Sequence, residues 1–228
     1  MKMKTLTLVA ACALFTTPAA AGKKTNAGDK AEAATGTAVT QLTLAQQLAD
    51  LSIERKDAIG LVTAARIMME IPTEEGTAIA EGAEEGKGTT DEKKDSGTVM
   101  SAETMLEKAT ELAGQDVIAL AMIQASSAVS TRGDISGPNR HEDVVRANAT
   151  DTYRVVFQGS VGAEVAIDGD GDTDLDLYIY DEGGNEICRS TSSNDVEYCS
   201  WTPAWTGPFE IKVRNLGSIY NRYIIYTN

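Results

Sequence analysis

Five aspartates stand at alternate positions between residues 168 and 176 of this chain, in the stretch DGDGDTDLD. Carboxylate oxygens are the hard ligands that Ca²⁺ prefers, and the ion takes about six to eight oxygens. The row therefore predicts a calcium site in a loop that leads into a strand. The expected ligands are Asp168, Asp170, Asp172, Asp174 and Asp181.

The spacing excludes two familiar calcium motifs. Counted from Asp168, the sixth position is Thr173, where an EF-hand loop has glycine, and the twelfth is Ile179, where it has glutamate. One acidic run also falls short of the repeated nonapeptides of calcium-binding β-rolls. The alternative to a cation site is an exposed acidic loop that keeps the chain soluble.

Enzyme chemistry has little support in the sequence. The chain has one histidine, His141, which is expected to be a solvated residue of the segment that enters the C-terminal domain. Nucleophile and metalloprotease motifs such as GxSxG and HExxH are absent from the sequence. We therefore predict a protein that is not an enzyme, and a small carboxylate-dependent hydrolase is the lowest-ranked alternative.

Two cysteines near the C-terminus, Cys188 and Cys199, are expected to form a disulfide, because close cysteines of an exported chain usually pair. Such a loop adds about 3 kcal/mol of stability in the chain-entropy model. Two buried free thiols are the alternative.

Aromatic residues supply a second candidate site. Trp205, Tyr178 and Tyr180 are predicted binding residues, because exposed rings stack on sugars or anchor a partner peptide. Trp201 is expected to be a core residue instead.

The N-terminus indicates export. Residues 1–21 have a basic start, an apolar run and the small-residue cleavage site Ala19-Ala20-Ala21, which predicts a signal peptide and a periplasmic or extracellular protein. The alternative is a lipoprotein anchored through Cys12. No other apolar run is long enough for a transmembrane span. The formal net charge of -14 argues against nucleic-acid partners, which require a basic surface.

Helical periodicity dominates the first half of the chain. A disordered leader over 22–39 is expected to precede a helical region over 40–132 with about four helices in two hairpins. Asp57 and Asp116 stand where the second helix of each hairpin needs an N-cap. The acidic, glycine-rich residues 72–100 predict a flexible loop between the hairpins, and 133–138 predict a linker.

Alternating residues with turn signals dominate the second half. About eight short strands without intervening helices predict an antiparallel β-sandwich of jelly-roll or Ig-like type over 139–228. The fold class is therefore α+β, with the helices and the sandwich as separate modules.

Three motifs of the predicted sandwich match a known pattern: DLDLYIYD over 174–181, the Gly184-Asn185 turn, and TGPFEIKV over 206–213. In these motifs residues 139–228 resemble the bacterial pre-peptidase C-terminal domain, a β-sandwich usually appended to secreted proteases. The resemblance implies an accessory module without catalysis. This chain departs from the pattern in having no protease domain and in its cysteine pair beside Trp201 and Trp205.

These observations predict an exported, non-enzymatic accessory or binding module whose sandwich is stapled by a disulfide and stabilised by Ca²⁺. Its partner is expected to be a protein or a cell-surface glycan. The alternative function is a carbohydrate- or cell-wall-binding protein that uses the aromatic residues.

Overall fold

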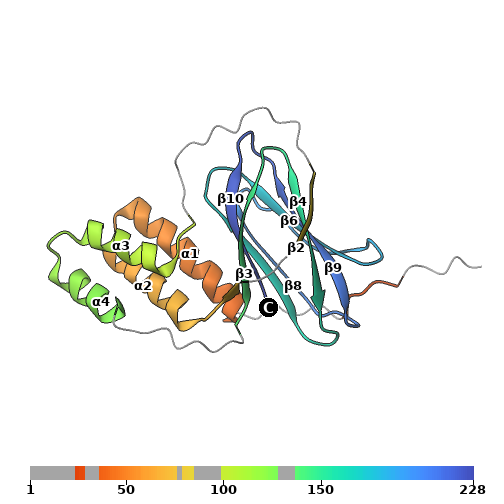
Figure 1. The fold of residues 1–228 in the computed structure, drawn as a ribbon, viewed down its shortest axis with the longest axis horizontal. Helices are drawn as coiled ribbons and strands as arrows, with labels where there is room; N and C mark the ends of the chain where they lie inside the picture. Colours follow the sequence, from red (N-terminus) through yellow and green to blue (C-terminus); the bar gives the residue numbers. More distant parts are fainter. Residues whose placement is uncertain (1–23, 29–35, 76–78, 85–98, 128–136) are drawn as a thin grey trace, which may run out of the picture.

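The computed structural model describes residues 24–28, 36–75, 79–84, 99–127 and 137–228. The predicted signal peptide over 1–21, with Cys12, lies outside these residues, as do residues 133–136 of the predicted linker. Figure 1 shows a helical unit beside a β-sandwich, which confirms the predicted α+β architecture.

The described part of the chain has four helices, and each begins at a side chain that can cap it. The helices are α1 (Ala38–Arg55), α2 (Ala58–Glu70), α3 (Ala102–Ala113) and α4 (Val117–Ser127). The caps are Thr37, Asp57, Ser101 and Asp116, whose oxygens accept hydrogen bonds from backbone N–H groups of the first turn. None of these helices is both long enough and apolar enough to cross a membrane.

Small side chains hold the helices together. Ala49 of α1, Ala65 of α2 and Ala109 of α3 are fully buried in one cluster with Leu61 and Met105. Alanines at a helix contact let the backbones approach closely, so α2 lies in contact with both α1 and α3.

The strands form two sheets that face each other. They are β1 (Glu74–Glu75), β2 (Ile79–Glu84), β3 (Asn139–Val145), β4 (Thr150–Phe157), β5 (Ala163–Gly169), β6 (Leu175–Asp181), β7 (Glu186–Ser190), β8 (Val196–Trp201), β9 (Gly207–Asn215) and β10 (Asn221–Thr227). The first sheet has the order β1-β3-β10-β5-β8 and the second the order β2-β4-β9-β6-β7. Their inner faces bury one shared core, which includes Trp201 as predicted.

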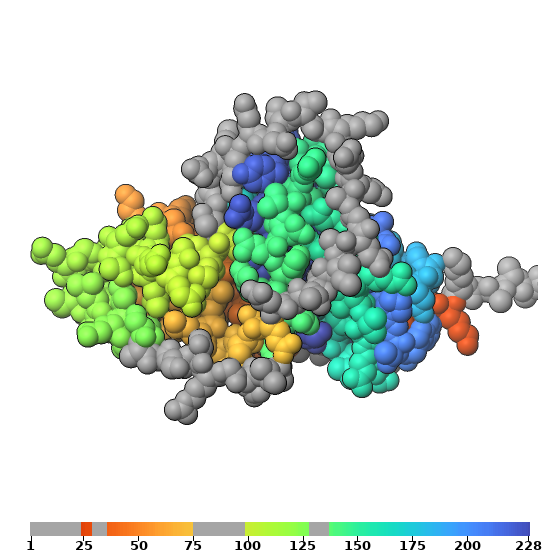
Figure 2. All heavy atoms as spheres, viewed as in Figure 1, coloured from red at the N-terminus to blue at the C-terminus, as the bar shows by residue number. Residues whose placement is uncertain are grey.

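The helical unit packs directly on the sandwich. Val39 and Leu42 of α1 are buried against Ala166 of β5 and against Ile224 and Tyr226 of β10, on the outer face of the first sheet. Figure 2 shows the helical atoms in contact with those of the sandwich. The two predicted modules therefore share an apolar interface in addition to their covalent connection.

The sequence predicted a flexible loop over the acidic residues 72–100, but this segment contains two strands. It contributes β1, which pairs in parallel with β3, and β2, which pairs antiparallel with β4. Each lies at an edge of its sheet, where pairing depends on backbone groups rather than on apolar side chains. Composition therefore does not reveal these strands.

Part of the predicted disordered leader over 22–39 is ordered. Asn26 is fully buried, and the N–H of Gly28 donates to the carbonyl oxygen of Thr202 at 2.7 Å. These contacts are specific hydrogen bonds, which a scan for apolar residues misses.

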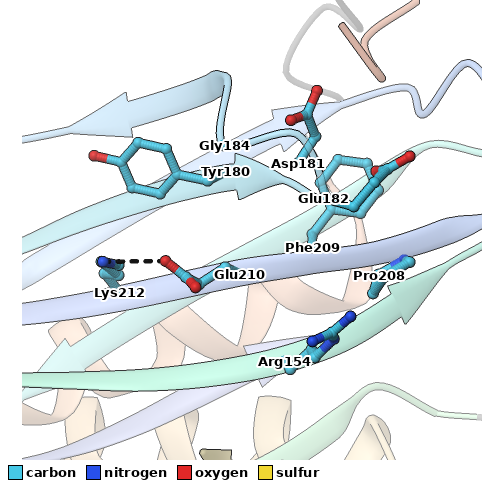
Figure 3. A pocket seen from close by; sticks show the side chains of 9 residues that line it. All are labelled: Arg154, Tyr180, Asp181, Glu182, Gly184, Pro208, Phe209, Glu210 and Lys212. Carbon is cyan, nitrogen blue, oxygen red and sulfur yellow. Dashed lines mark ion pairs between the residues drawn. The ribbon is translucent and has the colours of Figure 1, made fainter. Parts of the chain in front are cut away.

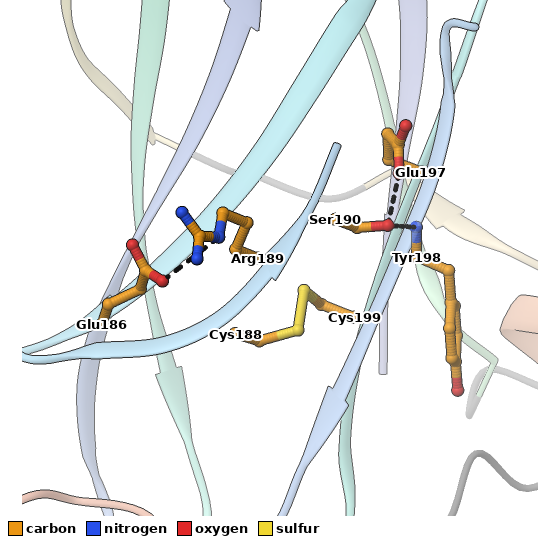
Figure 4. The surroundings of a disulfide bond; sticks show 7 residues. All are labelled: Glu186, Cys188, Arg189, Ser190, Glu197, Tyr198 and Cys199. Atoms are coloured by element: carbon orange, nitrogen blue, oxygen red, sulfur yellow. Dashed lines mark hydrogen bonds and ion pairs between the residues drawn. A yellow bond between two sulfur atoms is a disulfide. The ribbon is translucent and has the colours of Figure 1, made fainter. Parts of the chain in front are cut away.

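The predicted disulfide between Cys188 and Cys199 is confirmed, with an S–S distance of 2.04 Å (Figure 4). Cys188 lies on β7 of the second sheet and Cys199 on β8 of the first. The bond therefore joins the two sheets at one edge of the sandwich.

Candidate functional site

The outer faces of the two sheets have different surroundings. Helix α1 covers part of the first sheet, whereas the second sheet presents polar and aromatic side chains on β4, β9 and β6. Tyr180, Glu210 and Arg154 lie directly opposite one another on these three strands. The outward row follows from strand alternation, because the residues on either side of Glu210, Phe209 and Ile211, are buried in the core.

A groove of about 510 Å³ lies along this outer face, at the end near the β6–β7 turn (Figure 3). Its lining is Arg154, Tyr180, Asp181, Glu182, Gly184, Pro208, Phe209, Glu210 and Lys212. The strands of the second sheet give the groove a rigid floor, and the turn after β6 forms one wall. We call it the second-sheet groove.

Cationic and anionic groups alternate in the groove. Lys212 Nζ lies 3.1 Å from Glu210 Oε1 and 5.6 Å from the centre of the Tyr180 ring. Glu210 is 47% exposed and Lys212 32% exposed, so this ion pair is partly solvated and contributes little to folding stability. Because such a pair is weak, a bound ligand can replace either of its partners at small cost.

An ionised carboxylate lies beside an anchored indole at the end of the groove. Trp205 Nε1 donates to Glu182 Oε1 at 2.7 Å, and the side chain of Asn26 donates to Glu182 Oε2 at 3.4 Å. Hydrogen bonds from the Glu182 backbone N–H and from Trp205 lower the pKa of Glu182. Trp205 remains 38% exposed, so its ring is held in place at the surface.

Asp181 has a structural role in the same wall. Its Oδ1 accepts from the N–H groups of Gly183 and Asn185 at 2.9 Å, and its Oδ2 accepts from the N–H of Asn26 at 2.9 Å. Burial acts to raise the pKa of Asp181, but the hydrogen bonds from Asn185 and Asn26 outweigh it, so this pKa is lowered. The carboxylate therefore fixes the turn that shapes the groove.

The three predicted aromatic residues occupy different positions relative to the groove. Tyr180 lines it, and Trp205 adjoins it through Glu182. Tyr178 lies two residues earlier on the same face of β6, and its hydroxyl donates to Asp176 Oδ2 at 2.9 Å. Of the three predicted aromatic residues, Tyr180 is therefore the one that lines the groove.

The predicted calcium ligands do not all lie together. Asp181 ends β6, whereas Asp174 precedes it, and the seven residues of this strand span about 23 Å at about 3.3 Å per residue. Among the described residues, no group of three or more His, Cys, Asp or Glu side chains is arranged to hold a metal ion. A calcium site therefore stays a prediction, and Asp181 is too distant to share it with Asp168, Asp170, Asp172 and Asp174.

The loop between β5 and β6 is held by a carboxylate of its own, Asp170, and by Asp195 from the connection between β7 and β8. Asp170 Oδ2 accepts from the N–H of Arg222 at 3.1 Å, and Asp195 Oδ2 accepts from the side chain of Asn221 at 3.1 Å. Asp168 is 2% exposed, and its Oδ2 has no hydrogen-bond partner among the described residues. The hydrogen bonds of Asp170 and Asp195 hold together the corner where β5, β8 and β10 meet.

His141 is not the solvated linker residue that the sequence predicted. It lies on β3, where its Nε2 is 3.6 Å from Asp143 Oδ2 and its ring meets Tyr153 edge-on at 5.9 Å. Tyr153 in turn donates to Asp143 Oδ2 at 2.8 Å and shares a short hydrogen bond with the Tyr223 hydroxyl. This polar network crosses the interior of the sandwich near β3, away from the groove.

Sequence reasoning missed several residues of the site, including Arg154, Glu182, Glu210, Lys212 and Asn26. The strand alternation around residues 154 and 210 placed these side chains on an outer face. It did not show that the two strands are neighbours, because strand order is not visible in the pattern.

No family model matches this chain, and no curated protein sequence matches it. Solved structures with a similar sandwich include PliG of Aeromonas hydrophila, a periplasmic inhibitor of g-type lysozyme, at 11% identity and a TM-score of 0.33, covering 40% of this chain and 84% of that one. The pre-peptidase C-terminal domain of a Bacillus anthracis collagenase matches at 9% identity with a TM-score of 0.34. The match covers 40% of this chain and 89% of that domain. A carbohydrate-binding module solved with calcium and xylotriose, CBM36, matches at 20% identity with a TM-score of 0.26. The match covers 42% of this chain and 85% of that module.

Proposed function

We propose that this chain is an exported, non-catalytic binding module that recognises a polar ligand in the second-sheet groove. One observation supports this most directly: two aromatic residues, two cationic side chains and three carboxylates line one hollow on the rigid outer face of the second sheet. Binding sites combine an apolar surface with a few placed polar groups in this way. The disulfide agrees with export, because such bonds persist in oxidising compartments.

The carboxylates of the groove favour binding over hydrolysis. A glycoside hydrolase needs one carboxyl group with a raised pKa as general acid. Asp181 and Glu182 both have a lowered pKa, so each is ionised at neutral pH and accepts hydrogen bonds. Neither group is suited to donate a proton: Asp181 is buried and used by the turn, whereas Glu182 can accept hydrogen bonds from hydroxyl, amide or ammonium groups of a ligand.

A glycan is the ligand class that the groove favours. Tyr180 offers an aromatic surface to a sugar ring, and Arg154, Lys212 and Glu182 can bond its hydroxyl groups. A protein partner is the other candidate, since Trp205 is a partly exposed aromatic residue next to the groove.

A retention assay on purified peptidoglycan and on insoluble polysaccharides tests this proposal. The expected result is retention on at least one of these polymers, with binding about tenfold weaker for Tyr180→Ala and for Arg154→Ala. Arg189→Ala is the matched control, because Arg189 is exposed on β7 and pairs with Glu186 outside the groove. Equal retention of all variants would place binding elsewhere, and failure to bind any polymer would leave the glycan proposal without support.

A further inference from the structure

The helices α2 and α4 begin in the same way. In α2, Asp57 Oδ1 accepts from the backbone N–H groups two and three residues further on, both at 3.0 Å. In α4, Asp116 Oδ1 accepts from the equivalent groups at 2.9 and 3.2 Å. The shared cap aligns the two helices residue by residue, so that Leu61 corresponds to Leu120 and Ala58 to Val117.

Corresponding residues of the two helices differ in burial. Ala58 is 9% exposed and Leu61 is fully buried, whereas Val117 is 76% exposed and Leu120 is 38% exposed. The reason is that α2 packs against both α1 and α3, whereas the main helix contacts of α4 are with α2 and α3 on its inner side. The sequence thus places apolar residues on α4 at positions that another helix covers in α2.

The exposed face of α4 is apolar and uncharged. The helix has the sequence VIALAMIQASS, without a single charged residue. Its exposed residues are Val117, Ile118, Leu120, Ala121, Gln124, Ala125 and Ser127. Figure 1 shows α4 at the end of the helical unit that lies farthest from the sandwich, so the sandwich does not cover this face.

We propose that this face is a self-association surface on which the α4 helix of a second copy packs across a two-fold axis. With a net charge of -14, most surfaces of two copies would repel each other through their carboxylates. Helix α4 carries no charged residue, so two copies can meet there without this repulsion. A two-fold contact is self-complementary, so an uncharged apolar face meets an identical one. Ala121 and Ala125 lie one turn apart within it and let the two helix backbones come close.

The size of the surface determines the strength of the dimer. An 11-residue helix is about 16 Å long, and a single helix pair buries less than the roughly 800 Å² per partner of a standard interface. The expected dimer is therefore reversible, with a Kd on the order of micromolar.

Sedimentation velocity of the purified protein over about 5 to 500 µM tests the proposal. The expected result is a monomer that converts to a dimer as concentration rises. Val117→Glu should weaken the dimer by at least about tenfold, because it places a carboxylate in the apolar contact. Glutamate at the first position of a helix suits the helix dipole, so this variant is expected to fold normally, which far-UV circular dichroism checks.

The matched control is Val156→Glu, which adds the same charge at a residue that is 66% exposed on β4 of the sandwich. It should dimerise as the unmodified protein does. A protein that remains monomeric at every concentration would overturn the proposal. So would a dimer that Val117→Glu and Val156→Glu leave equally strong, because the contact would then lie on another surface or be made by another occupant.

Discussion

The backbone N–H of Asn26 donates a 2.9 Å hydrogen bond to Oδ2 of Asp181, although 155 residues separate the two in the sequence. The side chain of Asn26 also bonds the backbone of Trp205 in both directions, accepting from its N–H at 3.0 Å and donating to its carbonyl oxygen at 3.2 Å. The start of the described chain is therefore attached to the wall of the second-sheet groove. This attachment connects the N-terminal segment to the proposed binding site.

Substitution of Asn26 is expected to destabilise the sandwich. Asn26→Ala removes the side-chain bonds to Trp205 and Glu182 at a fully buried position and leaves the Trp205 N–H unpaired, which costs about 2 kcal/mol. Urea unfolding measures this loss. Thr25→Ala, at the exposed neighbouring residue, is the control and should change stability by less than about 0.5 kcal/mol. Equal stability of the two variants would show that the attachment does not contribute to folding.

The stability of the sandwich is expected to depend on the protonation of Asp151. This residue is 7% exposed, and burial raises its pKa to about 6. The hydrogen bond from Tyr223 at 3.0 Å acts to lower this pKa, and the negative charge of Asp143, which also faces Tyr153 and His141, acts to raise it. Because the folded pKa lies above the usual 3.8, the contribution is fully present below about pH 4 and is lost as the pH rises through about 6.

Asp151→Asn tests this dependence, since asparagine keeps an acceptor for the Tyr223 hydroxyl but does not titrate. Urea midpoints measured from pH 4 to pH 8 at constant ionic strength should show the unmodified protein losing stability relative to the variant between about pH 4 and pH 6. Glu107→Gln removes one negative charge from the exposed side of α3 and controls for net charge. Parallel curves for the unmodified protein and Asp151→Asn would contradict the prediction.

Loss of the disulfide is expected to destabilise the sandwich without changing its fold. Cys188 and Cys199 are 11 residues apart, and a loop of this size contributes about 3 kcal/mol in the chain-entropy model. The double variant Cys188→Ser/Cys199→Ser should lose about this amount in urea unfolding, and reductant should lower the stability of the unmodified protein alone. An effect of reductant on the double variant would show that it acts through another group.

Calcium is expected to stabilise the β5–β6 loop. Asp174 precedes β6, and its Oδ1 is buried without a hydrogen-bond partner in the described part of the chain, so a cation would satisfy it. Millimolar Ca²⁺ should raise the Tm of the unmodified protein, and a chelator should reverse the change. Asp174→Asn should remove most of this response, whereas Glu186→Gln on β7 should keep it. An unchanged Tm with Ca²⁺ would contradict the prediction and show that the loop is held by its hydrogen bonds without a cation.

The sequence predicted the elements that depend on neighbouring residues. The caps Asp57 and Asp116, the alternation around Phe209 and the cysteine pair follow from chemistry within about a dozen residues, and the structure confirms each of them. The acidic strands β1 and β2 were missed because they pair through backbone groups at sheet edges.

The sequence by itself therefore determined the helices, the strands of residues 139–228, the sandwich class and the disulfide, because periodicity, local capping and cysteine spacing encode them. Only the tertiary structure decided the groove and the place of Asn26. Strand order and register place Arg154, Tyr180 and Glu210 opposite one another. The tertiary fold also places Asn26 within hydrogen-bond distance of Asp181. These relationships depend on which strands become neighbours, and that choice results from packing the whole core rather than from any one segment.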